Sequence, residues 1–292
     1  MAIDILSAFE KEPPELDFIW PGFLAGTVGA LIAPGATGKS FWALEAAMAV
    51  ACGCAGGDLV ELGAVAAGPV LYLAGEDPVP ALVRRVHAIG KYLSPPARSS
   101  IAANLTLEPV MGAGFDIMNR DCFERLASCA SGWRLVVLDT LSRIHQLDEN
   151  SNGDIARLIG RLEQLAASTG AAVLFLHHAS KGSARDGLLD QQQAARGASA
   201  LIDNARWCGF IARMTEDDAS RFSSAGNGHA PVGKQSRERY VRFGISKQNY
   251  DAIVVDRWFE RQEGGVLRPA AFLEVQKQAA KARDLRRCVD GF

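Results

Sequence analysis

One eight-residue segment constrains this chain more than any other part of its sequence. Residues 33–40 read Ala-Pro-Gly-Ala-Thr-Gly-Lys-Ser; they follow the apolar run 28–32 and precede a helix-compatible segment, 41–52. A glycine-rich turn between a strand and a helix directs backbone N–H groups toward a phosphate, because the first amides of a helix lack intrahelical partners. The segment therefore predicts a phosphate-binding loop (P-loop), in which Lys39 contacts phosphate oxygens and Ser40 holds Mg²⁺.

The expected ligands of this loop are ATP and Mg²⁺. One position departs from the usual motif, since Ala33 stands where a glycine normally begins it, so the strand end must accept a Cβ. A glycine-rich turn that only caps a strand is the alternative, but the flanking strand and helix favour the nucleotide site. The nucleotide contacts are expected from Gly35, Ala36, Thr37, Gly38, Lys39 and Ser40.

Short apolar runs alternate with longer helical segments from Thr27 onward. This alternation is typical of strand–helix units around a mostly parallel sheet, so the predicted fold class is α/β. A helix packed on that sheet is expected where Ile155, Leu158, Ile159, Leu162 and Leu165 recur at spacings of three and four. Buried strands are expected at residues 28–32, 70–73, 105–107, 135–138 and 172–176.

Composition divides the chain into four predicted parts. Residues 1–25 contain three prolines among apolar residues and are expected to form an extended N-terminal arm with exposed aromatics, a possible subunit contact. Residues 26–213 are the expected ATPase core, and the Ser-, Gly-, Asp- and Arg-rich residues 214–239 are expected to be a flexible loop. Residues 240–292 are expected to hold two strands, at 240–245 and 253–259, before a mixed-charge helical tail.

Charge, cysteine spacing and the distribution of apolar residues argue against a uniformly basic nucleic-acid-binding protein, a zinc protein and a secreted or membrane protein. The 292 residues include 31 Lys and Arg against 33 Asp and Glu, so a nucleic-acid partner must meet a local basic patch. Six scattered cysteines lack zinc-ligand spacing and are expected to be plain thiols in a reducing compartment. The chain has neither a signal-peptide pattern nor a run of about 18 apolar residues, so we expect a cytoplasmic protein with no membrane contact.

Carboxylates end two of the expected strands. Asp139 follows an apolar run, at the sheet edge where parallel strands present ligand-binding groups, and would hold the magnesium. Glu76 ends another run and could position or deprotonate the attacking water, while Asp77 would cap the next helix. Taken singly, Asp139 could equally begin an ordinary turn, and Glu76 could instead cap the helix that follows it, although the role at the water is favoured.

Two further positions have both a catalytic and a structural interpretation. His177 and His178 close the fifth strand with side chains on opposite faces, so only one of them can face a nucleotide. A hydrogen-bonded structural histidine is the alternative for either. Arg206 is expected to begin a strand at the border of the core, where it could also pair with Asp203 or lie exposed.

Six segments together resemble the RepA replicative helicases of broad-host-range plasmids, which are ring-shaped hexamers with a RecA-like core. The likeness extends from near Asp4 to near Trp258, and the His-His-Ala-Ser-Lys and Gln-Gln-Gln segments are more specific than the P-loop. The tail after Pro269 diverges. The six segments are residues 35–40, 73–78, 136–143, 175–182, 191–197 and 203–207.

The resemblance implies a RecA-like P-loop NTPase fold and a role for each matching residue. Lys39 and Ser40 contact phosphates and metal, Glu76 is the catalytic carboxylate and Asp139 binds magnesium. His178 rather than His177 senses the γ-phosphate. Arg206 is an arginine finger that reaches the neighbouring subunit's site, a contact worth roughly 10³ to 10⁵ in rate in comparable enzymes.

In such a ring the long loop after His178 would face the central channel and grip single-stranded DNA through Lys181, Arg185 and Arg196. The same loop also carries Asp186 and Asp190, and a solvated loop without DNA contacts is an equal alternative.

Two function classes follow. The first is a homohexameric DNA helicase that hydrolyses ATP at subunit interfaces to move along single-stranded DNA during plasmid or mobile-element replication, with an initiator or primase as a possible partner. The second is a non-motor RecA-like ATPase that uses ATP as an assembly switch. A small-molecule kinase would need an acceptor pocket that no sequence pattern indicates.

Overall fold

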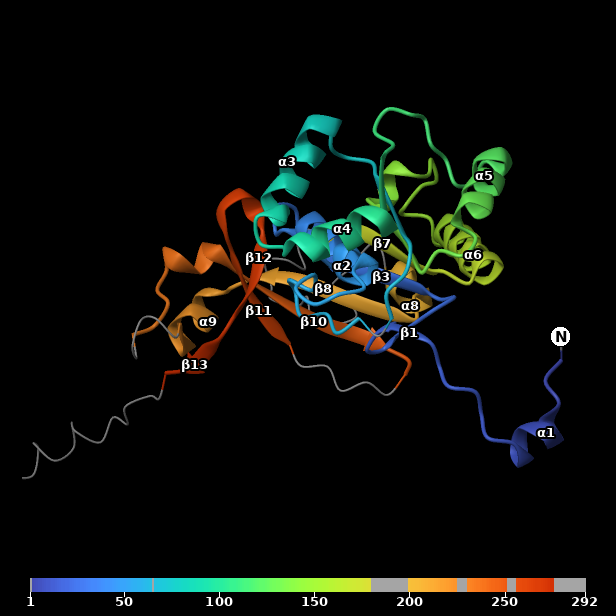
Figure 1. Ribbon diagram of the computed structural model, residues 1–292, viewed down its shortest axis with the longest axis horizontal. Coiled ribbons are helices and arrows are strands. Elements are labelled where there is room, and N and C mark those ends of the chain that lie inside the picture. The colour runs from blue at the N-terminus through green and yellow to red at the C-terminus, as the bar shows by residue number, and fades with distance from the viewer. Residues whose placement is uncertain (1, 65, 180–198, 225–229, 251–255, 276–292) are drawn as a thin grey trace, which may run out of the picture.

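The computed structural model describes residues 2–64, 66–179, 199–224, 230–250 and 256–275. Within these residues the chain folds around one nine-stranded sheet of order β12-β11-β10-β8-β3-β7-β6-β4-β5 (Figure 1). The strands are β3 (Val28–Ala33), β4 (Val70–Ala74), β5 (Leu105–Pro109), β6 (Leu135–Asp139), β7 (Ala172–His178), β8 (Trp207–Arg213), β10 (Tyr240–Gln248), β11 (Arg257–Arg261) and β12 (Leu267–Ala270). The predicted α/β class with a mostly parallel sheet is confirmed.

The six strands from β8 to β5 are parallel, and they include all five strands expected from the apolar runs. Their carboxyl ends meet along one edge of the sheet. The register pairs Ala33 with His178 and Ala74 with Asp139, so residues far apart in sequence become neighbours there. The P-loop follows Ala33, and this edge is therefore where nucleotide chemistry can take place.

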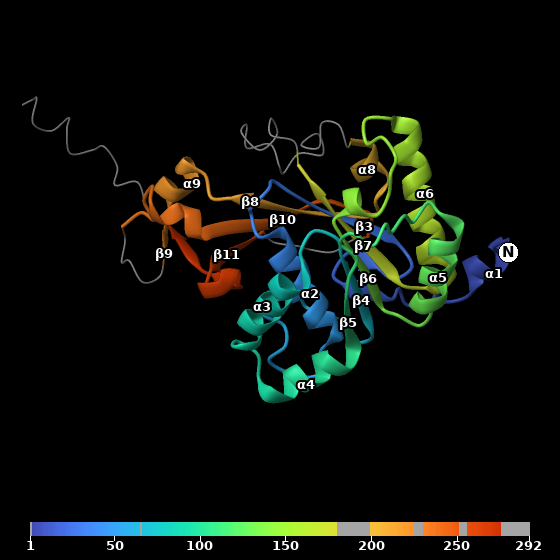
Figure 2. The same ribbon diagram turned by 90° about the horizontal axis from the view of Figure 1, so that it is seen from above.

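Helices cover both faces of the sheet (Figure 2). One face packs against α2 (Lys39–Ala51), α3 (Val79–Gly90) and α4 (Pro95–Asn104), and the other against α5 (Arg120–Ala130), α6 (Asn152–Thr169) and α8 (Ser199–Asn204). All five apolar residues of the expected helical stripe, from Ile155 to Leu165, are buried in α6. That helix begins at a Ser151 cap and ends at Gly170 in the left-handed conformation.

The N-terminal segment differs from the expected extended arm in two places. Residues Ile5–Glu10 form helix α1, because Asp4 caps its first turn and no proline interrupts it. Residues Phe18–Trp20 (β1) and Phe23–Leu24 (β2) form a hairpin whose Ile19, Trp20 and Phe23 are buried in the core. Trp20 and Phe23 pack against the molecule's own rings, among them Trp42 and Trp207. The expectation of exposed aromatics was therefore wrong for the hairpin, whereas Phe9 of α1 is exposed.

The segment 214–239 also contains regular structure that composition did not predict. Helix α9 (Glu216–Arg221) begins at a capping box of Thr215 and Asp218, followed by strand β9 (Phe222–Ser224) and the 3₁₀ turn η4 (Ser236–Arg239). Strand β9 pairs with β13 (Phe272–Glu274). The expectation of a flexible loop was wrong for these parts, because local caps and a distant strand supply backbone hydrogen bonds.

The C-terminal strands continue the main sheet. Strand β10 pairs antiparallel with β8, β11 with β10, and β12 with β11, and the turn η5 (Glu263–Gly265) joins the last two. The strand expected at 240–245 is confirmed, and the one expected at 253–259 begins at Arg257 within the described residues. The expected helical tail lies almost wholly outside them. The described helices include none long and apolar enough to span a bilayer.

Candidate nucleotide-binding site

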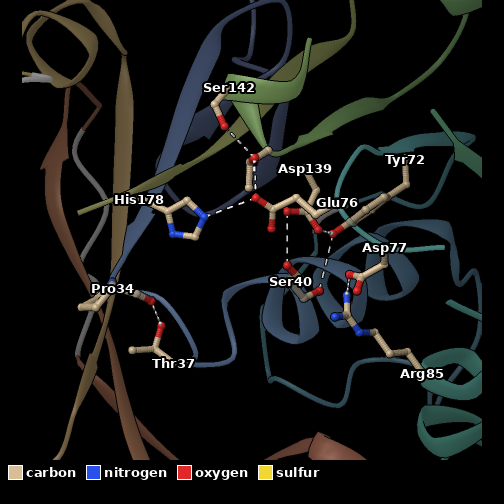
Figure 3. Close-up of polar contacts among 11 residues, drawn as sticks. Pro34, Thr37, Ser40, Tyr72, Glu76, Asp77, Arg85, Asp139, Ser142 and His178 are labelled. Atoms are coloured by element: carbon tan, nitrogen blue, oxygen red, sulfur yellow. Dashed lines mark hydrogen bonds and ion pairs between the residues drawn. The ribbon is translucent and has the colours of Figure 1, made fainter. Parts of the chain in front are cut away.

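The P-loop turns sharply between β3 and α2. Gly38 has a φ of +96° and Ala36 a φ of +59°, and both lie in the left-handed region. Glycine reaches that region without steric cost, which explains Gly38 directly before the helix. The Thr37 hydroxyl donates a hydrogen bond to the Pro34 carbonyl at 2.7 Å and closes the turn (Figure 3). Such alternation of backbone conformation lets successive N–H groups converge on an anion.

Lys39 supplies an ammonium at the first residue of α2. Its side chain is only 5% exposed, and Nζ has no hydrogen-bond partner among the described residues. Burial lowers the pKa of Lys39 to about 8, although the nearby Asp139 and Glu76 carboxylates oppose the shift. A buried ammonium without a partner is costly, and phosphate oxygens would supply the missing acceptors. The lysine therefore fits a nucleotide phosphate.

Oxygen atoms suited to a hard cation lie next to this lysine. The Ser40 hydroxyl donates to Asp139 Oδ1 at 3.2 Å, and the buried Tyr72 hydroxyl donates to Asp139 Oδ2 at 2.6 Å. Burial raises the pKa of Asp139, against the opposing hydrogen bond from Tyr72 and the charge of Lys39. Within the described part of the chain no cluster of His, Cys, Asp and Glu forms a metal site by itself. Ser40 and Asp139 would thus hold Mg²⁺ jointly with phosphate oxygens.

Glu76 and His178 face each other across the carboxyl edge (Figure 3). His178 Nε2 lies 3.4 Å from Glu76 Oε1, and the Thr140 hydroxyl donates to the same oxygen at 3.0 Å. Burial alone would raise the pKa of Glu76, but the hydrogen bonds from Thr140 and His178 outweigh it and lower the pKa. The carboxylate is therefore ionised at neutral pH and able to accept a proton.

The two histidines of β7 have different surroundings, as strand alternation requires. His178 is exposed beside Glu76, whereas His177 is 8% exposed. Burial lowers the pKa of His177 to about 4, so its imidazole is neutral at pH 7. His145 and Glu149, whose side chains lie 3.5 Å apart, contribute to the same electrostatic environment and were not found from the sequence.

Asp77 does not cap the next helix. The residue at the N-cap of α3 is Pro78, which has no side chain able to accept a hydrogen bond. Asp77 instead pairs with Arg85 at 2.6 Å, and the Arg85 guanidinium lies 5.3 Å from the centre of the Phe41 ring. The expectation of a cap was wrong because a cation further along α3 competes for the carboxylate.

These groups surround a cavity of about 340 Å³ above the P-loop. The predicted residues Lys39, Ser40, Glu76 and His178 all line it, while Asp139 lies beneath Ser40. Its other walls, Arg85, Arg261 and Gly265, were not found from the sequence. Among the described residues, the lining consists of Pro34, Ala36, Gly38, Lys39, Ser40, Phe41, Glu76, Arg85, His178, Arg261 and Gly265.

Arg206 lies at the opposite edge of the sheet. Its backbone N–H donates to the carbonyl of Val28, the first residue of β3, at 2.8 Å, and its side chain is exposed. The six residues of β3 place it roughly 17 Å from the P-loop of its own chain, at about 3.3 Å per residue. The structure does not bring Arg206 to the site formed by Lys39 and Glu76. Lys181, Arg185 and Arg196 lie outside the described residues.

A glycine-rich loop, a buried lysine and two strand-end carboxylates at the carboxyl edge of a parallel sheet define a P-loop nucleotide-binding domain. A family model described as an AAA domain matches residues 3–184, more than half of the chain. The chain belongs to that family.

Solved structures share the fold at low sequence identity. The chain is similar to the ATPase domain of the protein G-40P, with a TM-score of 0.56 and 14% identity over 90% of this chain and 95% of that one. It is also similar to the RadB recombinase, with a TM-score of 0.50 and 13% identity over 84% of this chain and 90% of that one. Both comparisons show that the chain shares its fold with these two proteins.

Proposed function

We propose that this protein is an ATP-dependent, ring-shaped DNA helicase that hydrolyses Mg-ATP at subunit interfaces and moves along single-stranded DNA. The observation that carries the ATPase part is the buried, unpartnered ammonium of Lys39, which faces the same cavity as the ionised Glu76. A cation and a proton acceptor that line one cavity suit the cleavage of a triphosphate by water. The motor part rests on the resemblance to RepA helicases.

Each residue of the site has a separate task in this proposal. The P-loop amides and Lys39 bind and orient the phosphates, and Ser40 and Asp139 hold Mg²⁺, which supplies positive charge to the phosphate oxygens. Glu76 accepts the proton of the attacking water. Thr140 and His178 contact Glu76 at 3.0 and 3.4 Å, and these contacts support the proposal that both residues orient Glu76. The further proposal that His178 responds to the terminal phosphate rests on the resemblance to RepA helicases.

Arg206 acts, in this proposal, on a neighbouring subunit. Arg206 lies at the amino edge of the sheet, roughly 17 Å from its own P-loop, which is too far for its side chain to contact the nucleotide of the same chain. A finger supplied by a second copy makes hydrolysis depend on assembly. We propose that the protein is a cytoplasmic homohexamer that acts in plasmid or mobile-element replication. Lys181, Arg185 and Arg196 would contact the DNA, and a replication initiator or primase would be the loading partner.

The competing function is an ATP-controlled assembly switch with no motor activity. To separate the two, wild type and Lys39→Ala would be compared for DNA-stimulated phosphate release and for unwinding of a forked duplex. We expect wild type to release phosphate faster with single-stranded DNA and to separate the strands, and Lys39→Ala to do neither. Rings that hydrolyse ATP and never unwind the fork would refute the motor and favour the switch. Undiminished hydrolysis by Lys39→Ala would refute the proposed site itself.

A further inference from the structure

Two arginines from the C-terminal half of the sheet reach the P-loop of their own chain. Arg213 is the last residue of β8 and Arg261 is the last residue of β11. Because β10 is antiparallel to both of these strands, β8 and β11 run in the same direction as β3 and end at the same edge. Sheet topology, rather than any motif, places these two guanidinium groups beside the nucleotide site.

Both guanidinium groups contact the first half of the P-loop. Arg213 Nη2 donates to the Gly35 carbonyl at 3.2 Å and to the Ala36 carbonyl at 3.4 Å. Arg261 Nη2 donates to the same Ala36 carbonyl at 3.3 Å and lies 3.6 Å from where a Cβ on Gly38 would stand. Each guanidinium has five N–H groups in a planar fork, so most of its donors remain available.

Neither arginine forms an ion pair with a carboxylate of the described residues. Four other arginines of the C-terminal half do form one, namely Arg221, Arg237, Arg239 and Arg242. Arg261 is partly buried and lines the cavity. Burial, followed by repulsion from Arg213, lowers the pKa of Arg261. Two neighbouring cations that share one carbonyl acceptor leave positive charge uncompensated, and an anion between them would remove the repulsion.

We propose that Arg213 and Arg261 form a cis-acting clamp for the terminal phosphate of the bound triphosphate. The clamp adds two arginines from the C-terminal strands to the site that contains Lys39 and Glu76. This inference rests on the proposed nucleotide site, because the anion is the end of the triphosphate held in the P-loop. A clamp of this kind distinguishes ATP from ADP, since only ATP carries the phosphate beyond the β position.

The alternative is that the arginines only brace the P-loop carbonyls. The two roles differ in measurable ways. Bracing supports the loop for any nucleotide, so its loss weakens ADP and ATP equally. A clamp contributes charge-assisted hydrogen bonds to one phosphate, and the loss of such bonds weakens binding of the triphosphate roughly 10- to 100-fold.

The experiment is a titration of fluorescently labelled ADP and a labelled non-hydrolysable ATP analogue, with Mg²⁺, against wild type, Arg213→Ala and Arg261→Ala. We expect each variant to bind the ATP analogue about tenfold or more weakly and ADP within about threefold of wild type. The matched control is Arg257→Ala, an exposed arginine at the other end of β11, which should leave both affinities unchanged. Equal weakening of both nucleotides, or no change in either, would overturn the clamp.

Lysine variants keep the test informative if the alanine variants do not fold. Arg213→Lys and Arg261→Lys keep the positive charge but replace the planar guanidinium with a single ammonium, and we expect an intermediate loss that is again confined to the ATP analogue. Unchanged circular dichroism verifies the fold. Lys39→Ala separates the two proposals: if it binds both nucleotides normally, the nucleotide site is wrong. If it loses both while Arg261→Ala and Arg261→Lys discriminate like wild type, only the clamp is wrong.

Discussion

Glu45 provides a sharp test of how the C-terminal strands are attached to the P-loop helix. It lies on α2, six positions after Lys39, and is fully buried. Its Oε1 accepts a hydrogen bond from the backbone N–H of Leu267, the first residue of β12, at 2.9 Å, while Oε2 has no partner among the described residues. Burial raises the pKa of Glu45 from 4.5 to about 8, despite this hydrogen bond. The folded protein therefore keeps this carboxyl protonated at neutral pH.

The direction of the pH effect follows from proton binding. Below pH 4.5 the carboxyl is protonated in both states, and its contribution to stability is fully present. As the pH rises toward 8, the unfolded chain releases the proton and the folded protein retains it, so folding becomes less favourable. Each pH unit in this window costs about 1.4 kcal/mol, which amounts to about 2 to 3 kcal/mol between pH 5 and 7.

The perturbation is Glu45→Gln, which keeps the size of the side chain and the carbonyl oxygen for Leu267 and removes the titration. Urea unfolding followed by tryptophan fluorescence at pH 5, 6 and 7 would give the free energy of unfolding of wild type and variant. We expect the difference between them to change by about 2 to 3 kcal/mol across this range, in favour of the variant at pH 7. Glu163→Gln on the exposed face of α6 is the control and should show no such trend. A difference that is constant with pH would refute a protonated Glu45.

Two further predictions concern nucleotide binding and hydrolysis. The pKa of about 8 for Lys39 predicts that the affinity for Mg-ATP is constant up to that pH and declines above it by nearly tenfold per pH unit. The reason is that bound phosphates favour the charged lysine, so above this pH binding requires the uptake of a proton. Calorimetry at pH 7.5 and 9 in two buffers would measure both the affinity and the proton uptake, and equal affinities at the two pH values would contradict it. Arg206→Ala is expected to bind nucleotide normally and to lose hydrolysis by about 10³-fold or more, with partial recovery when mixed with Glu76→Ala subunits. Phosphate release by the mixture would measure this, and a mixture without activity would show that Arg206 does not act across subunits.

The parts of the fold that sequence reasoning predicted correctly are those with local causes. Strand β3, the glycine-containing turn and helix α2 follow one another within 24 residues, Val28 to Ala51, and each has its own signal. The apolar stripe of α6 needs only the periodicity of a helix to be found. The candidate site residues Lys39, Ser40, Glu76 and His178, which line one cavity, were selected in the same way, because they end strands or begin a helix.

The parts that were mispredicted depend on distant partners. Prolines around the β1–β2 hairpin indicated an extended arm, and only the packing of Trp20 against Trp42 and Trp207 buries it. Composition indicated a flexible segment at 214–239, where β9 pairs with β13, about 50 residues further along the chain. Asp77 was expected to cap a helix and instead pairs with Arg85.

By itself the sequence determined the α/β architecture, the P-loop segment and which polar residues end the strands, because neighbouring residues carry the signals for a strand, a turn and a helix. Tertiary structure alone decided that Tyr72 binds Asp139, that Glu45 is buried against Leu267, and that Arg213 and Arg261 reach the P-loop. The physical reason is strand order: which strand ends lie side by side is set by packing of the whole sheet, and no local pattern encodes it.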